Sequence, residues 1–119
     1  MSDPKPYSGS CHCGAVRFTV NLDLSGVMQC NCSLCRRRGW LLTFVPADAF
    51  TLDAGADHLT EYRFNKKKIA HLFCRTCGVQ SFGRGDGPDG KPSVAVNVRC
   101  LDGVDLSTLP VKQVDGASF

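Results

Sequence analysis

Cysteine is the residue type with the most chemistry to offer in this sequence. Eight cysteines occur in 119 residues, and Cys11/Cys13 and Cys30/Cys32 are each spaced two apart. In an extended strand such residues point the same way with Cα atoms about 6.5 Å apart, near the upper limit for a disulfide but suitable for two thiolates on one ion. We therefore expect metal binding in a reducing compartment, rather than a disulfide scaffold or buried reduced thiols.

Four cysteines match a closed structural site. The pairs Cys11/Cys13 and Cys74/Cys77 are each followed at once by a glycine, which permits the positive φ that a turn around metal-bound sulfur needs. A C-x-C and a C-x-x-C pair together supply the four thiolates of a structural zinc site. This site would tie the N-terminal segment to the second half of the chain. Composition also permits iron there, although zinc is the default.

The other cluster is one ligand short. Cys30, Cys32 and Cys35 lie within six residues, so one ion can bind all three. Two alternatives are open: Cys100 or a histidine completes a second structural site, or the fourth position is free for substrate. Three thiolates around Zn²⁺ leave a formal charge of −1, which disfavours hydroxide formation and suits an incoming thiol. These three cysteines are therefore the candidate catalytic centre.

Basic residues and one histidine are candidates to assist the triplet. Arg36, Arg37 and Arg38 follow Cys35 directly and could offset its charge, with Arg36 or Arg37 receiving a substrate carboxylate. The alternative is a solvated turn, since charge runs are usually exposed. Among the three histidines, His71 is the candidate for a proton shuttle.

The remaining sequence predicts a mainly β, single small domain over residues 1–119. Many short apolar runs are separated by turn signals, with no long helical periodicity. We expect a short helical turn at 33–39, a helix near 106–109, a hairpin tip at the lysines 66–68 and an irregular lead-in over 1–10. Trp40 and Phe44 either wall a pocket or fill the core, and the core is the expected place. Strands are predicted over 15–20, 27–30, 41–45, 59–64, 69–73, 79–82 and 93–98.

Net charge and hydropathy indicate which partners and which location to expect. The net charge is +3, with 21% charged residues, which is too weak to favour a nucleic acid or an anionic membrane as partner. No apolar run approaches the length of a membrane span, and residues 1–10 lack a signal peptide's hydrophobic stretch. We expect a cytoplasmic protein.

Four segments together resemble the glutathione-dependent formaldehyde-activating family, which includes centromere-protein-V-like domains. They are G-S-C-H-C-G-A-V-R-F (9–18), C-N-C-S-L-C-R-R-R-G (30–39), F-C-R-T-C-G-V-Q-S-F (73–82) and N-V-R-C-L-D (97–102). The resemblance covers a core of about 9–103. Asn31 stands where histidine is common in the family's motif.

The resemblance implies a β-tent fold of small antiparallel sheets with two zinc ions. It assigns the structural zinc to the two outer cysteine pairs and the catalytic zinc to the triplet. The implied activity is that of a carbon–sulfur lyase, condensing glutathione with formaldehyde to S-hydroxymethylglutathione. Two other interpretations are a non-catalytic zinc module for protein or nucleic-acid contact, and a redox sensor that uses Cys100.

Overall fold

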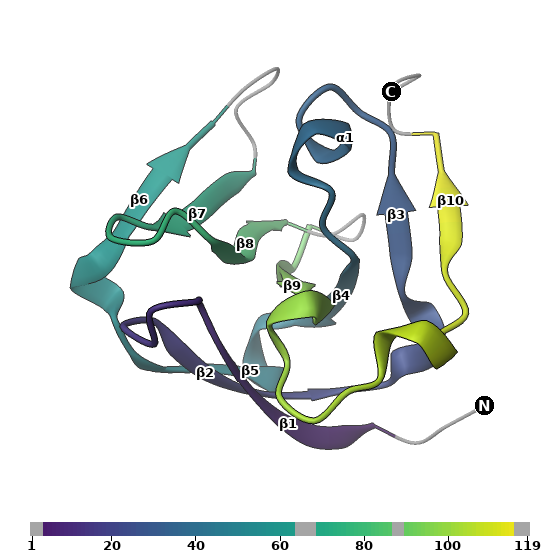
Figure 1. Ribbon diagram of the computed structural model, residues 1–119, viewed down its shortest axis with the longest axis horizontal. Coiled ribbons are helices and arrows are strands. Elements are labelled where there is room, and N and C mark those ends of the chain that lie inside the picture. The colour runs from purple at the N-terminus through teal and green to yellow at the C-terminus, as the bar shows by residue number, and fades with distance from the viewer. Residues whose placement is uncertain (1–3, 64–68, 87–89, 116–119) are drawn as a thin grey trace.

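The computed structural model describes residues 4–63, 69–86 and 90–115, and in this part the chain is built mainly of strands (Figure 1). The α-helix α1 spans Cys35–Arg38, and 3₁₀ turns lie at Leu24–Gly26, Ala47–Ala49, Ala56–His58, Val98–Cys100 and Leu106–Thr108. The strands are β1 (Lys5–Ser10), β2 (Arg17–Leu22), β3 (Met28–Cys30), β4 (Leu42–Pro46), β5 (Phe50–Ala54), β6 (Leu59–Tyr62), β7 (Ala70–Cys74), β8 (Gln80–Asp86), β9 (Pro92–Asn97) and β10 (Lys112–Val114).

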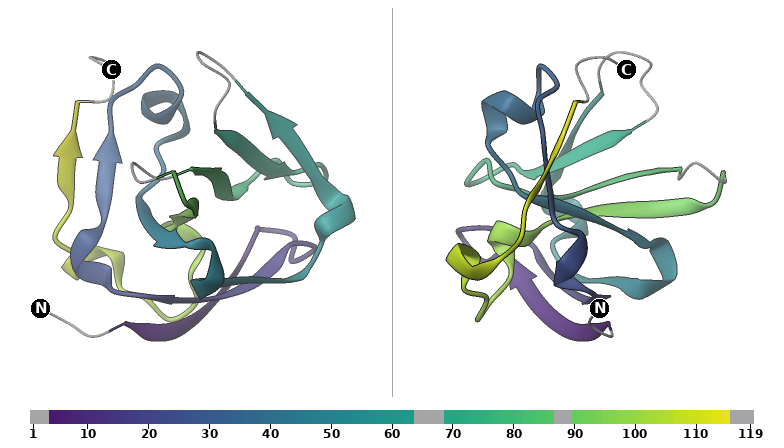
Figure 2. Two further views of the ribbon diagram at one scale, coloured as in Figure 1. Left: turned by 180° about the vertical axis from the view of Figure 1, so that it is seen from behind. Right: turned by 90° about the vertical axis from the view of Figure 1, so that its right-hand side faces the viewer.

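The strands form two sheets. A three-stranded sheet has the order β1-β2-β5, and a seven-stranded sheet has the order β10-β3-β4-β9-β8-β7-β6. Figures 1 and 2 show the small sheet across the base, with β3 and β10 standing on one side and β6 on the other. The predicted mainly β class is confirmed. The strand pairs are antiparallel as expected, except that β10 pairs with β3 in parallel.

The main core lies between the two sheets. In β2, exposed and buried residues alternate strictly, as expected for a strand with one face on a core. Phe18 of β2 stacks on Phe50 at 5.3 Å between ring centroids, and Phe50 meets Phe82 of the large sheet at 4.7 Å. Each such buried side chain contributes about 1.5–3 kcal/mol. The core also contains Val16, Val20, Leu22, Val27, Val45, Val94, Val96 and Val98.

The opposite face of the large sheet carries a second, smaller cluster. Trp40, Cys35, Leu42 and Ala95 are buried there, with the other two triplet cysteines partly buried beside them. The expected burial of Trp40 is confirmed. Phe44 is 53% exposed, so its predicted place in the core is wrong. The alternation of β4 directs it away from the face that holds Val45.

Several strand predictions need correction at their ends. The predicted lead-in contains β1, which pairs with β2 along its whole length. Its Pro6 is tolerated because β1 is an edge strand. β5 and β10 were not predicted, β8 runs on to Asp86 into the glycine-rich segment, and the expected helix near 106–109 is a 3₁₀ turn. The lysines 66–68 lie outside the described residues. No helix in the described part is long and apolar enough to cross a membrane.

Candidate metal centres and active site

Two loops of similar construction carry the four-cysteine cluster. One follows β1 and the other follows β7, and in each the N–H of the first cysteine, Cys11 or Cys74, donates to the carbonyl five residues later. The glycine after the second cysteine donates back to the carbonyl of the first, at 3.3 Å for Gly14 and 2.8 Å for Gly78. The φ angles of these glycines are 82° and 79°. The positive φ predicted from the sequence is confirmed, and an L side chain would be strained at either position.

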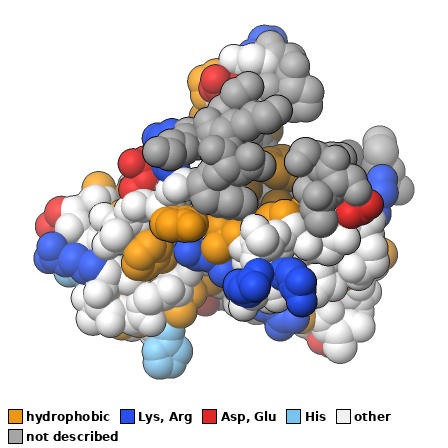
Figure 3. All heavy atoms as spheres, turned by 90° about the horizontal axis from the view of Figure 1, so that it is seen from above, with side chains coloured by type: hydrophobic (Ala, Val, Ile, Leu, Met, Phe, Trp, Pro, Cys, Tyr) orange, Lys and Arg blue, Asp and Glu red, His pale blue; other side chains and the backbone are white. Residues whose placement is uncertain are grey.

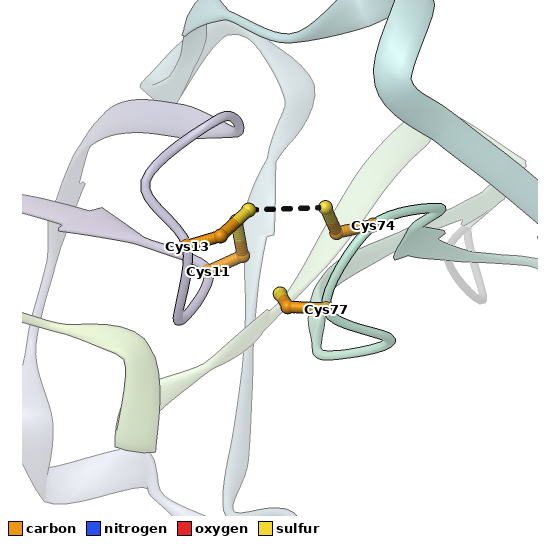
Figure 4. A group of neighbouring side chains, drawn as sticks. All are labelled: Cys11, Cys13, Cys74 and Cys77. Atoms are coloured by element: carbon orange, nitrogen blue, oxygen red, sulfur yellow. Dashed lines mark hydrogen bonds between the residues drawn. The ribbon is translucent and has the colours of Figure 1, made fainter.

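The four sulfur atoms converge on one point (Figure 4). The Sγ of Cys13 lies 3.6 Å from that of Cys11 and 3.6 Å from that of Cys74, and all four, including Cys77, lie within 4.8 Å of one another. Tetrahedral zinc with Zn–S bonds of 2.3 Å would separate its sulfurs by about 3.8 Å. Contrary to the extended geometry expected from the C-x-C spacing, Cys11 and Cys13 lie in a turn. The cluster therefore has the size and shape of a closed tetrahedral site.

Backbone N–H groups point at these sulfurs. Those of Val16 and Thr76 lie 3.4 Å from the Sγ atoms of Cys11 and Cys74. Burial opposes ionisation of Cys77, but backbone hydrogen bonds outweigh it and lower the pKa of that thiol to about 6. Because N–H donors stabilise a thiolate over a thiol, they favour the metal-binding form of Cys77. At Cys13 a backbone hydrogen bond with Ala15 lowers the pKa, but the neighbouring thiols, chiefly Cys74, outweigh it and raise the pKa to about 11.

The three-cysteine cluster is built from one short segment. Cys30 ends β3, Cys32 lies in the following bend and Cys35 begins α1, and their sulfurs lie within 4.8 Å of one another. The N–H of Cys32 lies 3.5 Å from the Cys30 Sγ, and that of Cys35 lies 3.3 Å from the Cys32 Sγ. Trp40 adds a buried donor, with its Nε1 3.2 Å from the Cys35 Sγ. This arrangement fits one thiophilic ion.

The terminal strand β10 holds the triplet segment in place. The N–H of Asn31 donates to the Val114 carbonyl at 3.1 Å, and its side-chain amide donates to Asp115 at 3.0 Å. The parallel pairing of β10 with β3 ends where Val114 meets Cys30. Nothing in the sequence pattern indicated this support, because a three-residue strand carries too little periodicity to be recognised.

Cys100 does not complete the triplet. Its Sγ lies 3.8 Å from the Gln80 carbonyl. Burial raises the pKa of Cys100, and the nearby Cys11 and Cys77 add to this increase, whereas a hydrogen bond with Ser81 opposes it. It therefore lies on the side of the four-cysteine cluster. Within residues 4–63, 69–86 and 90–115, no histidine, carboxylate or further cysteine joins the three sulfurs as a fourth ligand. In this part of the chain the closed alternative for the triplet is wrong.

The three arginines after Cys35 point in different directions. Arg36 and Arg37 are exposed on α1, and Arg37 bonds the Ser33 carbonyl at 2.8 Å. Arg38 is half-buried, donates to Gln80 and lies with its guanidinium carbon 5.6 Å from the Phe73 ring centroid. The signal that could have singled it out is spacing, because residues three apart share one side of a helical turn, here the buried side of Cys35.

His71 belongs to the same polar group. It is buried on β7, its Nδ1 lies 3.3 Å from the Gln80 side-chain nitrogen, and its ring meets Trp40 edge-on at 6.4 Å. Burial, and after it the charge of Arg38, lower the pKa of His71. The neutral imidazole is therefore the favoured form at physiological pH.

A wide shallow hollow lies elsewhere. Its lining comes from β6 to β9 and the Ala47 turn, and includes Glu61, Arg63, Arg84 and Asp86 but no cysteine. It is therefore separate from both cysteine clusters.

Comparisons with known proteins agree with this architecture. A crystal structure of a Rhodobacter sphaeroides protein is 34% identical to this chain, with a TM-score of 0.81, and the match covers 90% of this chain and 99% of that one. A family model described as glutathione-dependent formaldehyde-activating enzyme matches residues 6–114. That range includes all seven cysteines of the two clusters. The chain therefore belongs to the glutathione-dependent formaldehyde-activating enzyme family.

Proposed function

We propose that this chain is a zinc-dependent carbon–sulfur lyase that condenses glutathione with formaldehyde to S-hydroxymethylglutathione. The observation that carries the proposal is the triplet Cys30, Cys32 and Cys35, whose sulfurs converge without a fourth protein ligand in the described residues. Membership of the formaldehyde-activating family supports the choice of thiol and aldehyde.

Two zinc ions have different roles in this proposal. Cys11, Cys13, Cys74 and Cys77 hold a structural ion, because four thiolates leave no position for substrate. The triplet holds the catalytic ion. When bound there, zinc supplies a soft centre that keeps an incoming thiol in its nucleophilic, deprotonated form.

The reaction needs a proton transfer but no oxidant. The thiol sulfur bonds to the aldehyde carbon, the carbon–oxygen π bond opens, and the thiol proton ends on the oxygen. Neutral His71, or water, carries this proton. Exposed Arg36 and Arg37 on α1 present positive charge beside the triplet, where they attract a carboxylate of the thiol substrate.

The test is an NMR exchange experiment on zinc-loaded protein with formaldehyde and glutathione. Interconversion of the adduct should exceed the uncatalysed rate, and Cys35→Ser should remove the acceleration while the domain stays folded. Cys100→Ser is the matched control, because Cys100 lies outside the triplet and should retain the acceleration. Exchange at the uncatalysed rate would overturn the proposal, and salt-dependent DNA binding by the same protein would favour the binding-module interpretation.

A further inference from the structure

Arg38 is a half-buried cation without an acidic partner in the part of the chain that the structure describes. The described ion pairs join His58 to Asp57 and Arg63 to Glu61, and none involves Arg38. Burial is the main effect on this guanidinium, and it lowers its pKa, although nearby Cys35 opposes the change. A desolvated charge is costly unless something compensates it. Among the described residues the compensation comes from Cys35 and, after it, Tyr62, and a bound carboxylate would add to it.

The guanidinium is held in a fixed orientation. Its Nη1 donates to the side-chain oxygen of Gln80, and its carbon lies 5.6 Å from the ring centroid of Phe73. Gln80 is itself 5% exposed, and its nitrogen lies 3.3 Å from His71 Nδ1 and 3.4 Å from the Phe82 carbonyl. With Nη1 engaged, the donors on Nε and Nη2 remain as the side-on fork that binds a carboxylate with two hydrogen bonds.

The sheet beside Arg38 carries small residues between two exposed aromatic side chains. Cross-strand pairing places one row of residues on this face. The row is Phe44, Ala95, Gly83, His71 and Tyr62. In the middle of the row, Ala95 has only a methyl group and Gly83 has no side chain. Phe44 and Tyr62 at its ends are 53% and 47% exposed.

Figure 3 looks onto the top of the molecule as drawn in Figure 1 and shows hydrophobic side chains with Lys and Arg side chains beside them. A methyl group at Gly83 would lie 3.1 Å from the Ala70 carbonyl and 3.5 Å from the Gln80 nitrogen. A side chain at Gly83 would therefore crowd Gln80, the residue that holds Arg38.

We propose that Arg38 recognises a carboxylate of the thiol substrate and determines the preference of the triplet site for anionic thiols, with Gln80 as its positioning residue. This rests on the proposed function for the identity of the thiol. Arg38 shares the buried side of α1 with Cys35, whereas Arg36 and Arg37 face solvent. The exposed pair attracts the substrate at long range, and Arg38 makes the geometric contact.

A ligand pair separates recognition from catalysis. S-methylglutathione keeps both carboxylates but has no free thiol, and its diethyl ester lacks both carboxylates. Calorimetric titration of zinc-loaded protein should show that Arg38→Gln raises the Kd of S-methylglutathione at least tenfold and changes that of the ester less than twofold. Arg38→Lys should fall between, because a lysine keeps the charge without the fork. Arg84 is an exposed arginine on the opposite face of β8. Arg84→Gln removes the same charge and should leave the Kd of both ligands unchanged.

Gln80→Met tests the positioning role, because it keeps the size of the side chain but removes the acceptor. It should weaken S-methylglutathione several-fold and spare the ester, a split that a general loss of structure would not produce. Zinc content and near-ultraviolet circular dichroism report folding for each variant, and Arg38→Lys serves if Arg38→Gln does not fold.

Three results would overturn the inference: no binding of S-methylglutathione to the wild-type chain, an unchanged Kd in Arg38→Gln, or equal weakening of both ligands. Equal weakening would mean that Arg38 only neutralises the thiolates. Selective binding through Arg38 without accelerated formaldehyde exchange would instead reject the proposed function and leave the recognition role standing.

Discussion

The two cysteine clusters use the same ligand atom but lie in opposite settings. The four-cysteine cluster joins loops about sixty residues apart in sequence, and its Cys11 and Cys74 belong to the main core. The three-cysteine cluster comes from a single segment on the other face of the large sheet, where Cys30 and Cys32 are half-buried. On that face the polar side chains of Arg38, Gln80 and His71 are linked to one another.

The difference indicates how the same metal chemistry can be divided between stability and reaction. A closed set that crosslinks distant segments contributes to folding, because an ion bound there requires those segments to be together. A local set adds little to the fold, so it can leave a position open without cost to the rest of the domain. The comparison leads to four predictions, given from the largest expected effect to the smallest.

The first prediction concerns the closed cluster. Cys74→Ser should lose one zinc ion per chain and most of the cooperative unfolding transition. The reason is that zinc binding in small zinc domains contributes about 10 kcal/mol or more, comparable to the whole stability of a domain. Metal analysis and thermal unfolding measure both effects. A Cys74→Ser chain with two zinc ions and an unchanged transition would contradict the assignment, and Cys100→Ser is the control.

The second prediction concerns the open cluster. Cys32→Ser should also lose one zinc ion and remove at least 100-fold of the proposed acceleration. Its free energy of unfolding should nevertheless fall by only about 1–2 kcal/mol, because Cys32 lies outside the main core. Chemical denaturation in zinc-containing buffer tests this. If Cys32→Ser unfolds as readily as Cys74→Ser, the two clusters do not differ in the way inferred.

The third prediction concerns pH and His71. Burial and the charge of Arg38 place its folded pKa below the ordinary value of 6.5. As the pH falls below 6.5, the unfolded chain therefore takes up a proton that the folded chain resists. Stability should fall from that pH down to the folded pKa, by at most about 1.4 kcal/mol per pH unit, with no contribution above 6.5.

His71→Gln should flatten this part of the stability profile. Denaturation at pH 7.5 and pH 5.5, with zinc content checked at both, gives the difference between the variant and the wild type. Equal slopes in the two proteins would show that His71 does not resist protonation in the folded state.

The fourth prediction concerns a single hydrogen bond. Trp40→Phe keeps a buried ring but removes the donor to the Cys35 Sγ. One such bond is worth about 1 kcal/mol, so metal retention at the triplet should weaken about fivefold. Competition with a coloured chelator measures it. The four-cysteine cluster provides the internal control, and weakening at both clusters would point to a general loss of packing instead.

Much of the fold could be predicted where a local pattern was strong. The short apolar run over 15–20 identified the strand that became β2, and the apolar run before Pro46 identified β4. β1 and β10 were missed because prolines obscure the first and the second has only three residues. Phe44 was misplaced because hydrophobicity identifies a strand but does not say which of its two faces the core covers.

The sequence by itself indicated how seven cysteines divide into two sets and that Gly14 and Gly78 would have positive φ, because cysteine spacing and the two following glycines act over a few residues. It left open whether Cys100 or a histidine would complete the second set. Only the tertiary structure decided which neighbours surround that set. The approach of Gln80 to Arg38 joins residues 42 positions apart. Cys100 lies beside the other cluster because of how the large sheet folds over the small one. Such contacts follow from the packing of whole sheets, and no short stretch of sequence encodes them.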